Sequence, residues 1–242
     1  MARSGKTSPW VYVALGCLGA VAVAILVVAG LGFAGWRWAR GLEEQLEDPA
    51  ARAAKVLDVL GAERVPDGYH AVIALEIPFL MKMAILSDVP PRNDGNPEAW
   101  SADGGFEERG LIYFEIPSWG DEGENLDDFL EGRTDDAEFL RRSSIDLQRG
   151  EVIARGEVAL PGVERARYVA QRGTIGGDHG DGAEGLTSTV LVECSSDTRI
   201  RLAIWFGPDP DPEAAPEALA LGGTVADPEA LAGFFGQFRF CG

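Results

Sequence analysis

Residues 10–38 form an apolar run whose single charged side chain is Arg37, next to its end, and this run constrains the chain more than any other feature. Its central part, Val11 to Ala34, would measure roughly 36 Å as a helix, enough to cross a hydrocarbon layer of about 30 Å. Aromatic residues mark both ends of the run, as they do at the two headgroup layers of a bilayer. We therefore expect a single transmembrane helix at 10–38, preceded by a short cytoplasmic tail at 1–9.

A cleaved secretion signal is the alternative interpretation of this run. Gly32-Phe33-Ala34 offers the small residues that a signal peptidase needs, but the apolar part of a signal is usually only about 7 to 15 residues long. We therefore favour an uncleaved anchor that binds the lipid bilayer. Gly16, Ala20 and Ala24 recur at four-residue spacing, a pattern that lets two helices approach closely, so a homodimer through these residues is a further expectation.

Cysteine placement suggests on which side of the membrane the rest of the chain lies. Cys194 and Cys241 are the only cysteines outside the apolar run, and a disulfide between them would remove about 4 kcal/mol of unfolded-state freedom in the chain-entropy model. Such a bond persists in oxidising compartments. Two buried thiols are the alternative. We expect the disulfide, an N-terminus inside the cell and an extracytoplasmic domain, periplasmic or extracellular.

The charge of the chain changes abruptly after Arg40. Four of the 21 Lys and Arg residues and none of the 39 Asp and Glu residues lie in 1–40, so 41–242 hold 17 basic and 39 acidic side chains and a formal charge of −22. Nucleic acids and anionic lipid surfaces are repelled by such a charge. We therefore expect no nucleic-acid partner, and one acidic extracytoplasmic domain at 62–242.

A helical pattern follows the apolar run. Leucine and alanine recur near the 3.6-residue period in residues 41–60, which predicts a helix and, with its flanks, a helical stalk at 39–61. Asp48 followed by Pro49 is typical of a helix N-terminus, and Gly61 is typical of an end.

Alternating apolar residues predict strands in much of the remaining chain. Pro78 interrupts the first alternation, so residues 69–86 are expected as two short strands or one bent strand. Residues 87–110 and 207–226 are rich in turn formers and acids, and we expect them to be loops. The other expected strands are 111–116, 151–160, 163–172, 186–194 and 199–206.

Helical patterns accompany these strands. Short helices are expected around 126–130 and from Thr134 to Leu140, and Asp227-Pro228 is expected to begin a C-terminal helix with an aromatic stripe. In the last hairpin, alternation predicts one shared apolar face carrying Leu186, Val190, Val192, Cys194, Ile200, Leu202, Ile204 and Phe206. The predicted fold class is α+β: a mostly antiparallel sheet covered on one face by helices, including the C-terminal amphipathic helix.

Motifs for catalysis and metal binding are scarce. The sequence has no zinc-protease, nucleophile-elbow, P-loop or dinucleotide-binding fingerprint. His179, with its neighbours Asp178 and Asp181, is the metal candidate of the sequence. A metal site needs at least three converging ligands, and no second histidine cluster or cysteine pair of metal-binding spacing supports it, so we assign no metal site. The 87–110 loop lacks the spacing of a calcium loop. We assign no catalytic residue and expect no cofactor.

Four arginines provide the candidate binding site. Arg165, Arg167, Arg199 and Arg201 alternate along predicted strands at positions opposite to the apolar ones. Neighbouring strands would align them as a cationic stripe on the outer face, and arginine forks suit carboxylate or phosphate partners. Ion pairing with the many acids is the alternative role.

These observations favour a noncatalytic, membrane-anchored domain of the bacterial envelope that binds another protein or a small ligand. A membrane-anchored hydrolase of unknown type is the alternative, because 39 acids will place some carboxylate pair at catalytic spacing in any fold. A cavity with converging polar groups would favour the hydrolase, and a filled core with a flat exposed patch would favour the binding domain.

Overall fold

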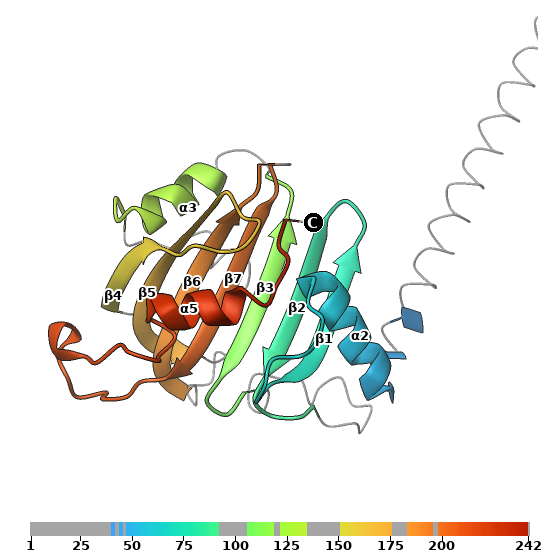
Figure 1. Cartoon of the computed structure of the whole chain (residues 1–242), viewed down its shortest axis with the longest axis horizontal. Coiled ribbons are helices and arrows are strands. Elements are labelled where there is room, and N and C mark those ends of the chain that lie inside the picture. The colour runs from blue at the N-terminus through green and yellow to red at the C-terminus, as the bar shows by residue number, and fades with distance from the viewer. Residues whose placement is uncertain are drawn as a thin grey trace, which may run out of the picture. The chain divides into compact units, whose positions relative to one another are not determined.

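Figure 1 shows the chain as a computed structural model that describes residues 40–41, 44–45, 47–91, 106–118, 122–134, 151–175, 183–195 and 198–241. Residues 1–44 and 45–242 are two separate units. The expected span at 10–38 lies outside the described residues, together with the cytoplasmic tail and the small-residue positions Gly16, Ala20 and Ala24. Among the described residues, no helix is long and apolar enough to cross a membrane.

Seven strands form one sheet in the second unit, with the spatial order β1-β2-β3-β7-β6-β5-β4 (Figure 1). Each pair of neighbours is antiparallel, which confirms the α+β class and the antiparallel sheet. The strands are β1 (His70–Ile77), β2 (Met81–Ser87), β3 (Gly110–Ile116), β4 (Glu151–Glu157), β5 (Arg165–Ile175), β6 (Ala183–Glu193) and β7 (Ile200–Pro208).

Helix α2 (Pro49–Leu60) begins and ends where its sequence predicts. The Asp48 side chain accepts a hydrogen bond from the backbone N–H of Ala50, and Gly61 closes the helix in the left-handed conformation at φ 62°. Val56, Val59 and Leu60 are buried against the sheet. The end of the stretch expected as a stalk is therefore part of the domain core.

The sheet carries a separate apolar cluster on each of its two faces. Helices α2 and α5 (Pro228–Phe235) pack on one face, where Trp205 stacks on Phe234 with ring centroids 4.3 Å apart. Helix α3 (Glu122–Leu130) packs on the other face and buries Phe129 among residues of β5, β6 and β7. The expectation of helices on one face only is therefore wrong: α3 covers part of the second face. The helix expected from Thr134 lies largely outside the described residues, and a short 3-10 helix, η2 (Pro216–Ala218), is present in the acidic connector.

The register of the last hairpin corrects the predicted shared face. Val190 pairs with Ala203 and Leu191 with Leu202, so the two expected apolar sets are offset by one residue. Ile200, Leu202 and Ile204 belong to the α3 cluster, whereas Leu186, Val190, Val192 and Cys194 belong to the cluster under α2 and α5. β7 is buried on both faces, so its apolar residues do not alternate with polar ones. Its sequence therefore could not indicate which of its residues share a face of the sheet with the apolar residues of β6.

The C-terminal tail closes over the α2 side of the sheet. A disulfide joins Cys194 to Cys241, as expected, with their Cα atoms 5.6 Å apart. The backbone N–H of Arg239 donates to the carbonyl oxygen of Leu60 at 3.2 Å, and Phe238 and Phe240 are buried. The tail thereby forms one wall of the hollow that contains the candidate site.

Candidate functional site

An open groove of about 870 Å³ lies between the C-terminal half of α2, strands β2 and β3, the beginning of β7 and the C-terminal tail. Its charged lining consists of four cations and three acids, in a domain whose overall charge is strongly negative. We call it the basic groove, defined by Lys82, Tyr113, Glu115, Arg199, Arg201 and Arg239. The groove therefore carries a small positive net charge, in contrast to the excess of acids in the domain as a whole.

Strand register brings the central charges of the basic groove together. Lys82 of β2 pairs with Glu115 of β3, and Glu115 pairs with Arg201 of β7. Directly opposed residues of neighbouring antiparallel strands project from the same face. One transverse row of the sheet therefore carries the charges +, −, + from three distant parts of the sequence.

Glu115 is a buried carboxylate with partners on several sides. Its Oε1 atom accepts from Arg199 Nη1 at 2.9 Å, and its Oε2 atom lies 3.7 Å from Arg201 Nε. The hydroxyl of Tyr113 donates to Oε2 at 3.4 Å. A carboxylate with so little exposure needs such partners, since desolvation of an unpaired charge is costly. Two guanidinium groups thus share one carboxylate at the floor of the groove.

Lys82 differs from the other charges of the groove. Among the charged lining side chains that the structure describes, it alone has neither a hydrogen bond nor an ion pair. Arg239, at the tail wall, pairs with Glu63 at 2.7 Å, and both are well exposed. An incoming anion can reach Lys82 without displacing an existing partner, whereas the arginines already hold acids.

The four arginines predicted to form one stripe lie on opposite faces of the sheet. Arg165 and Arg167 face the α3 side, where Arg165 pairs with Glu157. Arg199 and Arg201 lie on the other side, in the basic groove. The four arginines therefore do not form one stripe. The prediction failed because the sequence of β7, which is buried on both faces, does not reveal its register with β6.

Arg167 is the centre of a structural ion cluster. Its guanidinium contacts Asp127 and Glu131 of the α3 region and Glu193 of β6. Burial by itself would lower the pKa of Arg167, but the hydrogen bonds to Asp127 and Glu193 outweigh it and raise the pKa. The cluster holds α3 to the sheet and engages both terminal nitrogens of the Arg167 guanidinium.

The metal candidates Asp178, His179 and Asp181 lie outside the described residues. Within the described ranges, no group of three or more His, Cys, Asp or Glu side chains converges as a metal site would require. Asp88, in the loop considered for calcium, uses both carboxylate oxygens to accept N–H bonds from Glu107, Glu108 and Arg109 at 3.0, 2.7 and 2.9 Å. It closes the neck of that loop.

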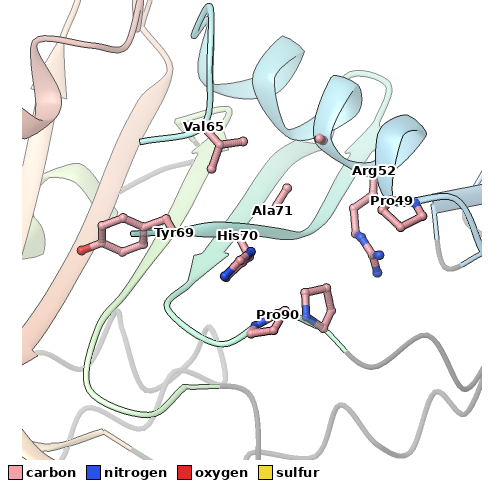
Figure 2. Close-up of a pocket in the computed structure, with 9 residues that line it drawn as sticks. Pro49, Arg52, Val65, Tyr69, His70, Ala71 and Pro90 are labelled. Atoms are coloured by element: carbon pink, nitrogen blue, oxygen red, sulfur yellow. The ribbon is translucent and has the colours of Figure 1, made fainter. Parts of the chain in front are cut away.

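A second hollow of about 310 Å³ lies between α2, the beginning of β1 and the segment at Pro90. Figure 2 shows the imidazole of His70 and the guanidinium of Arg52 beside it, with Pro49 and Pro90 at its border. The described lining includes no Asp or Glu, so His70 has no carboxylate partner for acid–base chemistry there. The Tyr69 hydroxyl accepts from Trp205 Nε1 at 2.8 Å, and burial raises the pKa of Tyr69.

The chain matches no protein-family model, and a comparison with curated proteins found no match. Sequence reasoning found Arg199 and Arg201 but missed Lys82, Tyr113 and Glu115. The signal for Glu115 was present, because a single acid inside the apolar strand 111–116 indicates a buried charge with a partner.

Proposed function

We propose that this chain is a single-pass membrane protein whose extracytoplasmic domain binds a small anionic ligand in the basic groove without catalysing a reaction. The observation that carries the proposal is the row formed by Lys82, Glu115 and Arg201 on the groove floor. Beside this row lies Arg199, so the groove floor brings a lysine without a described partner next to two arginines that share one carboxylate. Carboxylate and phosphate groups are the partners that such donors favour.

The charge of the domain argues for a small ligand. A polyanion would meet the negative field of residues 41–242 over most of its length, and its association would be slowed and weakened. A ligand with one or two anionic groups fits inside the groove and meets mainly its cations. We therefore expect a small carboxylate or phosphate compound.

The location rests on two features. The apolar run at 10–38 is long enough to anchor the chain, and the disulfide between Cys194 and Cys241 favours an oxidising compartment. The proposed topology has the N-terminus inside and the sheet domain outside. Carbonate extraction of native membranes and alkylation of thiols without reductant test it: the chain should stay in the pellet, and only Cys17 should react.

Calorimetric titration of the full-length protein in detergent tests the binding site. Inorganic phosphate and succinate are the probes, and Lys82→Gln is the variant that removes one groove cation without breaking an ion pair. Its affinity should fall by about 10-fold or more, the value of one charge-assisted hydrogen bond. Arg64→Gln is the matched control, because it removes one positive charge from an exposed side chain outside the basic groove.

Equal affinity of the Lys82→Gln and Arg64→Gln variants would contradict the assignment of the site. Absence of heat with both probes would contradict the ligand class. Either result leaves the membrane anchor to be judged by the extraction experiment alone.

A further inference from the structure

The turn between β1 and β2 exposes two large apolar side chains. Phe79 is 88% exposed and Leu80 is 47% exposed, and these are the exposed large hydrophobic residues of the described part of the chain. The backbone N–H of Leu80 donates to the carbonyl oxygen of Ile77 at 3.0 Å, which closes a four-residue turn around Pro78 and Phe79. We call residues 78–80 the hairpin tip.

Phe79 occupies a backbone conformation that disfavours its own side chain. It has φ +67°, and among the described residues it is the only non-glycine with positive φ. A turn with Pro at its second position and positive φ at its third normally has Gly or Asn at the third. Phenylalanine there is strained by its Cβ atom and also exposes an apolar ring to water. Folding gains nothing from this ring.

We propose that the hairpin tip inserts Phe79 and Leu80 into the interfacial layer of the membrane that anchors the chain. This inference rests on the anchor proposed above. Contact with lipid removes the phenyl ring of Phe79 and the branched side chain of Leu80 from water, so the exposed apolar surface of the tip becomes a stabilising contact.

The size of the tip favours the anchoring membrane over a free partner. Two buried side chains of this kind support a dissociation constant of about 1 mM, too weak to hold a freely diffusing protein. Binding to the membrane that anchors the chain is different, because the tether keeps the tip at a high effective concentration near the lipid. Most of the entropy cost of bringing two free molecules together is then avoided. The connection from Trp38 to Pro49 spans at most about 40 Å, so the domain of an anchored chain stays within reach of the lipid.

The charges at the base of the tip are suited to this location. Glu76 and Lys82 are the charged residues nearest the turn on the two strands, and they oppose each other in register. Lys55 Nζ lies 2.5 Å from Glu76 and 3.3 Å from Asp58, so two of the three lysines in the chain lie here beside these two acids. Lysine side chains extend readily toward lipid headgroups while their stems contact apolar groups. These four side chains carry no net charge, so the base of the tip meets less repulsion from anionic headgroups than the strongly acidic remainder of the domain would.

The test uses the full-length protein in phosphatidylcholine vesicles with Cys17→Ser as background, in which the remaining native cysteines are joined in the disulfide. Phe79→Cys is labelled with an environment-sensitive fluorophore. Asp67→Cys, a 90% exposed site just before the opposite end of β1, is the matched control. The tip label should shift to shorter emission wavelength and be quenched by nitroxide lipids, and the control label should do neither.

Three other outcomes would each overturn the inference. Equal, water-like emission at both sites in a chain that floats with the vesicles would reject tip insertion while the anchor stands. A wavelength shift without nitroxide quenching would indicate a protein contact, such as a second copy, in place of lipid. Failure of the chain to float would reject the anchor and the tip insertion together.

Discussion

Cys194, just after the end of β6, and Cys241, in the C-terminal tail, are joined by a disulfide that fixes the tail across the sheet with Cα atoms 5.6 Å apart. The tail carries Phe238 and Phe240, which are buried with Phe235 in one aromatic cluster. The disulfide thus closes a loop of the chain and also retains part of the core and one wall of the basic groove.

Removing the disulfide should destabilise the domain. We expect Cys241→Ser to lower the free energy of unfolding by about 2–4 kcal/mol, because the unfolded chain regains the freedom of the open loop. Urea unfolding followed by circular dichroism measures the change. Cys17→Ser is the control and should leave the midpoint unchanged, and an unchanged midpoint for Cys241→Ser would show that the tail is held by packing alone.

Two arginines on β5 should differ in their contribution to stability. The Arg167 side chain is 8% exposed and contacts three carboxylates, so Arg167→Gln should cost about 2 kcal/mol. The Arg165 side chain is 44% exposed and pairs with Glu157, so Arg165→Gln should cost less than about 1 kcal/mol. Urea unfolding of both variants measures the difference, and equal costs would mean that the Arg167 cluster does not hold α3.

Relieving the strain at the hairpin tip should not destabilise the fold. Phe79→Asn should keep or raise the free energy of unfolding, by up to about 1 kcal/mol, because asparagine tolerates positive φ and exposes no apolar ring. Thermal unfolding in detergent measures it, with Leu80→Asn as a neighbouring control. A clear loss of stability for Phe79→Asn would indicate that the ring packs in the folded domain.

Acid should weaken the neck of the 87–110 loop. Burial by itself would raise the pKa of Asp88, but the N–H bonds from Glu107, Glu108 and Arg109 outweigh it and lower the pKa below its usual range. A folded-state pKa below the unfolded value gives stability that is fully present above the unfolded pKa, about 3.9, and is lost as the pH falls through the folded pKa. Asp88→Asn should therefore be less stable than the wild type at pH 7, and the difference should shrink below about pH 4.

Unfolding midpoints measured between neutral pH and about pH 3 test this expectation. Asp227 is a useful comparison, because hydrogen bonds from the backbone N–H groups of Gly223 and Glu229 lower its pKa in the same direction. A difference between Asp88→Asn and wild type that stays constant with pH would show that the lost contribution is not the charge of Asp88.

Local chemistry explains which parts of the fold were predictable. Asp48, Gly61 and Asp227 cap their helices where the sequence indicates, because capping depends on a side chain and backbone groups within a few residues. Pro78 separates β1 from β2 for a similar reason. The pairing of Cys194 with Cys241 was predictable because no other cysteine lies outside the apolar run at 10–38.

The candidate site was predictable only in part. Arg199 and Arg201 were recognised as cations of a strand, but their placement relative to Arg165 and Arg167 required the register of β6 and β7. The fully buried β7 shows apolar residues at both parities, so its sequence fits either face. For the same reason, the sequence did not indicate that α3 packs on the opposite face of the sheet from α2 and α5.

The amino-acid sequence by itself determined the apolar run at 10–38, the acidic character of the rest, the helix ends and the cysteine pair, because each is a property of single residues or neighbours. Only the tertiary structure decided that Lys82, Glu115 and Arg201 share one row, and that Phe79 stands exposed in a strained turn. Such features depend on strand register and on burial, which arise when segments distant in the sequence compete to cover the same sheet.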